Sequence, residues 1–283
     1  MVRCLQIAPR KNADETVREY LARLRSLGFK TPTSKMIKSE EDIVGCLEAG
    51  RINSLVLDEV EKHIEIGMST QDIDDIVVRK TRELGGRCAC LGYEGFPKSV
   101  CTSLNRVVCH GIPSHRDILR EGDILNVDCT TEYRGYFGDA SRMFCLGKIS
   151  SEAEKLVRVT REALECAVSH IVPYESHLGD IGYYISRHAR ANGFSVVREI
   201  GGHGVGIAMH EDPYVCHTGL LGSGMVILPG MIFTVEPMVN AGKPSFYIDS
   251  RDGWTVYTSD GKLSAQIEYE LLITEDGAEI ISR

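Results

Sequence analysis

Four acidic residues stand inside segments that otherwise have the composition of apolar strands. Asp128 interrupts ILNVDCT, and Asp139 follows it eleven positions later. Glu236 ends the run MIFTVEP, and Glu268 interrupts SAQIEYELLI. Acidic residues are depleted in strand interiors, and burying an unpaired carboxylate costs several kcal/mol. Each of the four therefore needs a partner.

A histidine in a glycine-rich run is the fifth candidate. His203 lies in GGHGVGIAMHEDP, residues 201–213, where missing side chains let the backbone approach whatever the imidazole binds. Any one of the five alone is as easily explained as a salt-bridged strand residue or a loop histidine. Together, four buried carboxylates would repel one another unless a cation lay between them, so we expect the five to converge on metal.

The ligand types indicate which metals to expect. An oxygen-rich site with one imidazole favours Mn, Fe or Co over a thiolate-type zinc site, with Zn as a further alternative. Four carboxylates also suffice to bridge two ions about 3.5 Å apart, the spacing of two-metal hydrolytic sites. Such ions make hydroxide available near neutral pH, which suits amide hydrolysis. We therefore expect two divalent metal ions.

Two helix pairs and the strands between them must position these residues. Periodicity and capping signals predict helices along Ile43–Val60, along Thr70–Leu84, after a capping box of Ser151 and Glu154, and along Leu178–Ala191. Strands are expected within 124–147, with a turn near 132–135, and at 226–228, 231–235 and 265–274. Helix pairs that alternate with hairpins favour a mixed α+β sheet over a parallel doubly wound one.

The second half of the chain repeats the first at an offset of 108 residues. Asp180 corresponds to Asp72 in this way, and Gly193 corresponds to Gly85. The correspondence predicts two structurally related halves, chance being the alternative for so sparse a match.

The composition bounds the class of protein. The 283 residues are 43% hydrophobic and carry a net charge of -8, which argues against nucleic acid as the main partner. No apolar run approaches the roughly 18 residues of a membrane helix, and the start MVRCLQIAPRKNADE has no apolar core for a secretion signal. Ten cysteines without a CxxC pair are interpreted as reduced thiols. We expect a cytoplasmic protein.

Residues 1–37 are interpreted as an N-terminal extension that precedes a domain of residues 38–283. Val17, Tyr20 and Leu24 recur at helical spacing, and Gly28 predicts the end of this helix before a linker at 31–34. Five Arg and Lys residues between Arg10 and Arg25 are compatible with an RNA or ribosome contact. A solvated helix face explains them more simply.

Seven motifs in order closely resemble those of the type I methionine aminopeptidases. They are SVCTSLNRVVCHGIP, NVDCT, YFGDAS, GGHGVGIAMHEDP, FTVEPMVNAGK, DGWTVYT and LSAQIEYE, within residues 38–283. The resemblance implies the pita-bread fold, with two pseudo-two-fold halves of helix pairs around a central antiparallel sheet. It also implies a cytoplasmic monomer that removes the initiator methionine from nascent polypeptides when the next residue is small, by attack of a metal-bridging hydroxide.

The resemblance assigns roles to the five metal ligands. Asp128 would bind one ion, and His203 and Glu236 the other, while Asp139 and Glu268 would bridge the two. Glu236 would also be the general base.

The resemblance further implies a substrate site. His110 would donate a hydrogen bond near the scissile bond, and His210 would polarise the scissile carbonyl, a role worth on the order of 3 kcal/mol. Sulfur and aromatic side chains suit an unbranched thioether. The pocket for the methionine side chain would be lined by Cys90, Tyr93, Phe96, Cys101, Met209, Met238 and Trp254.

Several positions depart from the family pattern. Glu94 stands where His is usual, Arg106 where Glu is common, and Met209 where Phe is frequent, while Tyr269 follows Glu268 where His is usual. We expect Glu94 to alter the preference beyond the first substrate residue and the pH profile rather than the reaction.

Two alternatives remain at this point. An Xaa-Pro aminopeptidase is disfavoured because such enzymes usually carry a much larger preceding domain and lack the cysteine-lined pocket. A non-catalytic pita-bread protein that binds a peptide or partner would have lost metal ligands, and here all five are present.

Overall fold

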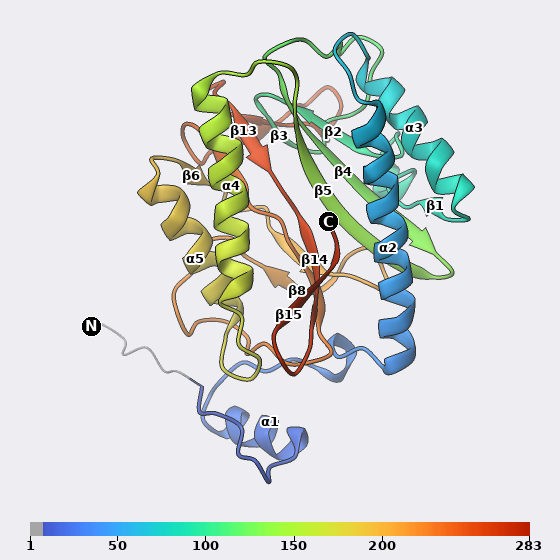
Figure 1. The fold of residues 1–283 in the computed structure, drawn as a ribbon. Helices are drawn as coiled ribbons and strands as arrows, with labels where there is room; N and C mark the ends of the chain where they lie inside the picture. The colour runs from blue at the N-terminus through green and yellow to red at the C-terminus, as the bar shows by residue number, and fades with distance from the viewer. Residues whose placement is uncertain (1–7) are drawn as a thin grey trace.

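Two pairs of helices flank the strands that fill the centre of the molecule (Figure 1). The computed structural model describes residues 8–283. The first pair is α2 (Glu40–His63) and α3 (Thr70–Glu83), and the second is α4 (Ser151–Ser169) and α5 (Leu178–Ala191). All four helices lie where the periodicity predicts them, and the expected α+β class is confirmed.

The start of α4 differs from the prediction by one residue. Ser150, not Ser151, is the N-cap, and its hydroxyl accepts from the backbone N–H of Ala153. Ser150 keeps an extended backbone (φ -69°, ψ 155°), whereas Ser151 is already helical, so the expected capping box of Ser151 and Glu154 does not form. Capping boxes do occur at the start of α2, at Ser39, and of α3, at Ser69.

The longest hairpin provides the centre of the first half. Strands β4 (Ile124–Tyr133) and β5 (Tyr136–Cys145) are antiparallel and pair Asp128 with Ser141 and Thr130 with Asp139. Their two-residue turn, at 134–135, has positive φ at both positions, as tight hairpins require. On its other side β4 pairs with β1 (Arg87–Cys88) and β2 (Cys101–Leu104).

Three further sheets complete the fold. The largest has the order β15 (Ala278–Ser282), β14 (Tyr269–Ile273), β9 (Ile232–Val235), β7 (Gly202–Gly204) and β8 (Glu211–Val215). The other two are β13 (Ser264–Gln266), β10 (Met238–Asn240) and β6 (Ser195–Val196), and β11 (Phe246–Ile248), β12 (Val256–Thr258) and β3 (Val107–Cys109).

Two strand predictions were wrong. Residues 226–228 form no named strand, although Val226 makes an isolated bridge to His177. The expected strand 265–274 is divided between β13 and β14, which belong to different sheets, and Glu268 lies at the break. The strand β15 was not predicted.

The offset of 108 residues holds for whole elements. Helices α3 and α5 have the same length and begin and end 108 residues apart. Strand β1 pairs with β4 as β6 pairs with β10: Cys88 lies opposite Thr131, and Val196 lies opposite Val239. In this correspondence the position of Asp128 in the first half is that of Glu236 in the second.

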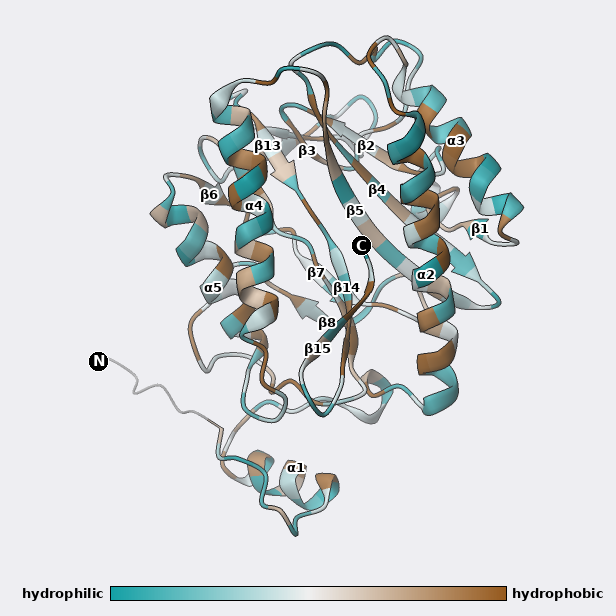
Figure 2. Ribbon diagram, viewed as in Figure 1, coloured by the Kyte–Doolittle hydropathy of each residue, from teal (hydrophilic) through white to brown (hydrophobic). Residues whose placement is uncertain are grey.

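Each half has an apolar core, and the helices turn their hydrophobic sides toward the strands (Figure 2). The N-terminal helix α1 (Val17–Ser26) joins the core of the second half through Tyr20 and Leu24, which are fully buried. Gly28, at φ +84°, follows its end, as predicted. Across residues 8–283, no helix is both long and apolar enough to cross a membrane.

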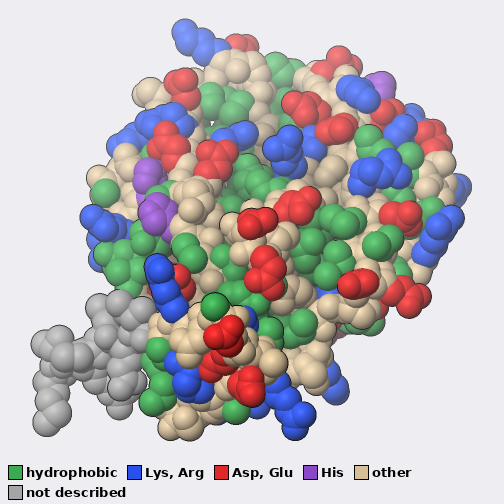
Figure 3. Space-filling model, turned by 60° about the horizontal axis from the view of Figure 1, so that its bottom comes forward, with side chains coloured by type: hydrophobic (Ala, Val, Ile, Leu, Met, Phe, Trp, Pro, Cys, Tyr) green, Lys and Arg blue, Asp and Glu red, His purple; other side chains and the backbone are tan. Residues whose placement is uncertain are grey.

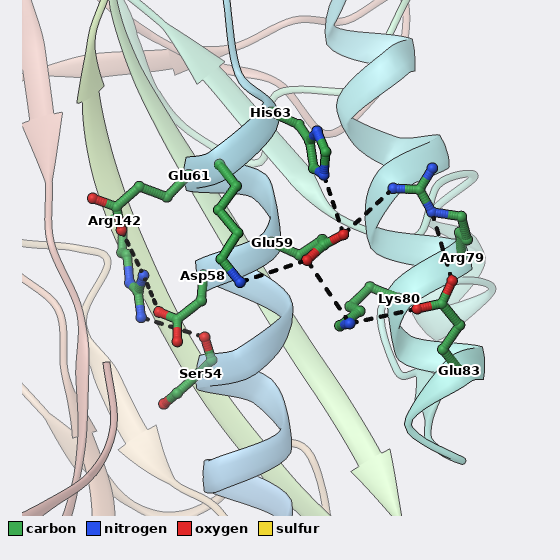
Figure 4. A network of polar contacts seen from close by, with 10 residues as sticks. Ser54, Asp58, Glu59, Glu61, His63, Arg79, Lys80, Glu83 and Arg142 are labelled. Atoms are coloured by element: carbon green, nitrogen blue, oxygen red, sulfur yellow. Dashed lines mark hydrogen bonds and ion pairs between the residues drawn. The ribbon is translucent and has the colours of Figure 1, made fainter.

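Polar contacts tie α2 to its neighbours (Figure 4). Glu59 forms ion pairs with Arg79 at 3.7 Å and with Lys80 at 3.8 Å, both on α3. On the other side of the helix, Arg142 of β5 lies 2.8 Å from Asp58. These contacts hold α2 between its partner helix and the central hairpin.

Candidate metal centre and substrate cavity

A cavity of about 450 Å³, here called the site cavity, is lined by residues of both halves. Thirteen of the fourteen residues predicted for the site line it. They are Cys90, Tyr93, Phe96, Cys101, His110, Asp128, Asp139, His203, Met209, His210, Glu236, Trp254 and Glu268.

The five predicted metal ligands lie together where the sheets meet: Asp128 and Asp139 lie within β4 and β5, His203 lies within β7, and Glu236 and Glu268 lie at breaks between strands. The Nε2 atom of His203 lies 3.8 Å from Asp139 Oδ2 and 3.7 Å from Glu236 Oε1. Ligand atoms of Asp139, His203 and Glu268 all lie within 4.8 Å of one another, and Asp128 lies beside Glu268. The arrangement leaves room for a cation between the carboxylates and the imidazole.

Neighbouring polar side chains orient these ligands. The Thr130 hydroxyl donates to Asp139 Oδ1 at 2.9 Å, and the Thr234 hydroxyl donates to Glu236 Oε1 at 2.9 Å. Gln266 Nε2 donates to the other oxygen of Glu236 at 3.1 Å. Such supporting hydrogen bonds are typical of metal ligands.

The imidazole of His203 is oriented in the same way. Its Nδ1 lies 3.0 Å from the carbonyl oxygen of Gly204, so Nδ1–H donates there and the lone pair of Nε2 faces the carboxylates. Burial lowers the pKa of His203 to about 4, which keeps the ring neutral at pH 7. A neutral imidazole with a free lone pair is the form that binds metal.

Within residues 8–283, the carboxylates of the site cavity have no Lys or Arg beside them to offset their charge. Neither Lys nor Arg is among the residues that line the site cavity. Burial raises the pKa of Asp139 to about 8 and raises the pKa values of Asp128, Glu236 and Glu268 well above their usual range. A divalent cation would reverse these shifts, and the donor set of oxygens with one imidazole fits Mn, Fe or Co.

The two other predicted histidines lie beside this cluster. The His210 ring lies 4.1 Å from the His203 ring, and its Nδ1 lies 2.7 Å from the Tyr93 hydroxyl. His110 faces Trp254 edge-on at 6.1 Å, and burial lowers its pKa to about 4. Both histidines therefore line the same cavity as the ligands.

Sulfur and aromatic side chains form one wall. Cys90, Phe96 and Cys101 are buried together, with Met209 and Trp254 packed against them. Phe96 meets Trp254 edge-to-face at 5.3 Å.

Met238 lies elsewhere, contrary to the prediction. It is 1% exposed and packs in the interior with Val108, Cys109, Val197 and Val256. Pro237 separates β9 from β10, and the two strands belong to different sheets, so the spacing from Glu236 does not carry Met238 into the cavity.

Several residues of the site were not predicted. Tyr214 lies at its exposed rim, and Gly201 lies under the Tyr214 ring, where a Cβ would come 2.5 Å from the Val215 carbonyl oxygen. Glu94, which the departures from the family pattern lead us to expect near the site, also lies at the rim. Glu270 is fully buried, and its Oε2 accepts from the backbone N–H of Asp139 at 3.0 Å. Glu270 could have been found from the sequence, because it is a second acid within an apolar strand, two positions after Glu268.

Comparison with known proteins agrees with this geometry. Residues 45–275 match the metallopeptidase family M24. The chain belongs to this family.

The similarity to named relatives extends over most of the chain. It is 45% identical over 245 residues to methionine aminopeptidase A of Synechocystis, covering 86% of this chain and 96% of the relative. It is 44% identical over 250 residues to methionine aminopeptidase of Escherichia coli, covering 87% and 93%. The resemblance to methionine aminopeptidases is thereby confirmed.

Solved M24 structures confirm the pita-bread fold. Methionine aminopeptidase from Rickettsia prowazekii superposes with a TM-score of 0.85 at 39% identity, covering 87% of this chain and 99% of that one. X-Pro aminopeptidase from Thermotoga maritima shares the fold at a TM-score of 0.68 and 22% identity, but this chain covers only 62% of it. The Xaa-Pro alternative thus has support from the fold alone.

Proposed function

We propose that this M24 metallopeptidase removes methionine from the N-termini of newly made polypeptides when the next residue is small. The observation that carries the proposal is the site cavity, which joins a cluster of unpaired carboxylates and an imidazole to a wall of sulfur and aromatic side chains. The identity of 44–45% to methionine aminopeptidases supports the same reaction.

The metal centre is proposed to hold two divalent ions, Mn, Fe or Co, with Zn as an alternative. Asp128 would hold one ion and His203 and Glu236 the other, with Asp139 and Glu268 shared between them. Bound there, the ions would lower the pKa of water and polarise the scissile carbonyl. Glu236, oriented by Thr234 and Gln266, would accept the proton of that water.

The histidines would act on the peptide. If the Tyr93 hydroxyl donates to Nδ1 of His210, the Nε2–H of His210 faces the cavity and donates to the scissile carbonyl oxygen. His110, neutral because burial lowers its pKa to about 4, would donate near the scissile nitrogen. The thioether would lie against Cys90, Cys101, Phe96 and Trp254, through contacts of about 0.3 to 1.5 kcal/mol each.

The setting of the enzyme completes the proposal. We place it in the cytoplasm as a monomer, with residues 1–37 as an extension and 38–283 as the catalytic domain. The nine cysteines within the described residues are free thiols, as a reducing compartment favours.

We also propose a ribosome contact through residues 1–37, with a solvated helix face as the alternative. The face of the molecule that includes the N-terminal region mixes acidic and basic side chains (Figure 3). Arg23 pairs with Glu15 at 2.7 Å and Arg10 pairs with Glu175 at 2.7 Å, so two of its basic side chains already have acidic partners. A solvated helix face remains the simpler explanation.

Peptide cleavage tests the proposal directly. The protein is stripped with a chelator, assayed on Met-Ala-Ser and Ala-Pro peptides, and assayed again after Mn or Co is added. We expect cleavage of Met-Ala-Ser alone, and only with metal. Cleavage of the Ala-Pro peptide would favour the Xaa-Pro alternative, and no cleavage with bound metal would favour a binding protein. Metal analysis of protein purified without added metal identifies the ions and their number.

A further inference from the structure

A buried ion pair lies behind the loop that carries Met209 and His210. The side chain of Lys38 is 1% exposed, and its Nζ pairs with Oε2 of Glu211, whose side chain is 18% exposed. Neither residue lines the site cavity. A charge buried to this extent requires a close partner, so each residue fixes the position of the other.

The other oxygen of Glu211 binds the loop itself. Glu211 Oε1 accepts from the backbone N–H of Ile207 at 2.7 Å and from that of Ala208 at 2.8 Å. Hydrogen bonds to an ionised acceptor are shorter and stronger than neutral ones. The Glu211 carboxylate therefore links the two ends of the loop 207–211, and Met209 and His210 lie between these ends.

Neighbouring segments of the chain fix both the backbone and the side chain of Lys38. Its backbone N–H donates to the Gly230 carbonyl at 2.8 Å, and the preceding Ile37 bridges to Met231. Its side chain packs against Gly206, where an added Cβ would come 3.3 Å from Lys38 Cε and 2.7 Å from Cys46 Sγ. The ammonium group thus has little freedom to move away from Glu211.

The backbone of the loop has few other anchors, whereas two of its side chains contact the cavity wall: Met209 packs against the sulfur and aromatic cluster, and His210 lies 2.7 Å from the Tyr93 hydroxyl. Ile207 is 52% exposed, so its side chain gives the loop little packing against the core. The start of the loop is fixed by the Phe137 N–H, which donates to the Gly206 carbonyl at 2.9 Å. Between there and β8, the described backbone bonds of the loop run to Glu211 or within the loop itself.

We propose that the Lys38–Glu211 pair is a positioning device that holds His210 at the distance from the metal ligands at which it can donate to the scissile carbonyl. This inference rests on the proposed function of His210. Lys38 and Glu211 act through the loop and touch neither substrate nor metal. Because a misplacement of about 1 Å can cost about 10²-fold in rate, losing the anchor should lower kcat.

The test uses a double-mutant cycle in the full-length, metal-loaded protein. Lys38→Met keeps the length of the side chain and removes its charge, and it is compared with His210→Ala and with the double variant. We expect Lys38→Met to lower kcat by about 10- to 100-fold, with metal content and KM little changed. In the His210→Ala background the same substitution should lower kcat by less than about 3-fold.

Matched variants separate positioning from stability. Arg142→Met removes another half-buried cation, on β5, and should leave kcat unchanged. If Lys38→Met does not fold, Glu211→Gln replaces it in the cycle, because its amide oxygen still accepts from the loop while the ion pair is lost. Glu211→Gln should lower kcat less than Glu211→Ala does.

The outcomes distinguish the two hypotheses. If His210→Ala is fully active, the proposed role of His210 is wrong. If His210→Ala is impaired but Lys38→Met and Glu211→Gln retain wild-type kcat, or if the substitutions combine additively, the positioning role alone is overturned.

Discussion

Two cavities of similar size lie on the two sides of the central strands. They differ in whether their acidic side chains have basic partners. The second, of about 410 Å³, is here called the α2–α4 groove. It is lined by Asp58, Glu61, Ser141, Arg142, Met143, Phe144, Arg161, Glu165, Ile267, Tyr269 and Arg283. In the groove, Arg142 lies 2.8 Å from Asp58 and 3.1 Å from Glu61 (Figure 4).

Strand β5 and the break between β13 and β14 supply residues to both cavities. Asp139 faces the site cavity, whereas Arg142, three positions later, faces the groove. Glu268 faces the site cavity and its neighbour Tyr269 the groove. Tyr269, which departs from the family pattern, therefore lies outside the site cavity.

The difference shows that the function of a buried acid can be inferred from whether it has a basic partner. Asp58 and Glu61 of the groove have a guanidinium partner in Arg142, and Glu165 accepts from the Tyr269 hydroxyl at 3.5 Å, so the chain itself supplies their partners. In the site cavity, Asp139, Glu236 and Glu268 are more deeply buried, and no Lys or Arg within residues 8–283 lines that cavity. Their missing partner must come from outside the polypeptide, which is the physical basis for a metal centre.

The largest effect is expected when a cavity acid loses its charge. Glu268→Gln removes a ligand proposed to be shared by both ions, so bound metal and kcat/KM should both fall, the latter by more than about 10³-fold. Metal analysis and peptide cleavage measure the two quantities. Asp58→Asn, in the groove, is the control and should change neither. If Glu268→Gln kept its full metal content, the view that the acids of the site cavity hold metal would be contradicted.

The two cavities should also differ in their response to pH. Without metal, burial raises the pKa of Asp139 from 3.8 to about 8, so between these values the folded state binds more protons than the unfolded state. Stability from this group is therefore present below about pH 4 and is lost as pH rises toward 8. Bound metal requires the ionised form of Asp139, so the metal-loaded protein does not lose this stability as pH rises.

The gap in unfolding temperature between metal-loaded and chelated protein should consequently widen from about pH 5 to about pH 8. Thermal unfolding at several pH values measures it. Glu61→Gln in the groove should leave the gap as it is in the wild type. A gap that stays constant across this range would contradict the assignment of buried, protonated acids to the metal-free cavity.

A smaller effect is expected from the groove. Arg142→Met removes the partner of Asp58 and Glu61, but both acids are substantially exposed, at 44% and 66%. Water can replace the guanidinium there, so we expect a loss of about 1 kcal/mol in unfolding free energy and an unchanged kcat. Chemical denaturation and peptide cleavage measure these values. A loss of bound metal would show that the two cavities are coupled.

The smallest effect concerns selectivity at the rim. Glu94 is exposed at the mouth of the site cavity, in a backbone conformation with φ +47°. Glu94→His should shift kcat/KM between peptides that differ after the first residue by several-fold, because it removes a negative charge near His210, while metal content stays constant. A panel of Met-Ala peptides with acidic and basic third residues measures the ratios. Unchanged ratios across the panel would refute the role of Glu94.

The sequence predicted what local patterns determine. The four main helices follow from apolar spacing, the four acids proposed as ligands stand out because acids are rare in apolar strands, and His203 stands out in its glycine-rich run. Sequence spacing failed where the chain changes sheets, as between Glu236 and Met238, because alternation holds only within one strand. It also could not find Lys38, since the partner that explains its burial lies 173 residues further along the chain.

The distance along the chain between the ligands also determines when the enzyme becomes competent. Asp128 lies on β4 in the first half and Glu268 lies between β13 and β14 in the second, and most of the residue pairs in contact are far apart in sequence. A polypeptide still under synthesis holds an incomplete set of ligands until residue 268 has left the ribosomal tunnel. With the proposed ligand set, metal acquisition would be among the last events of maturation, and unfinished copies would not hold the metal tightly.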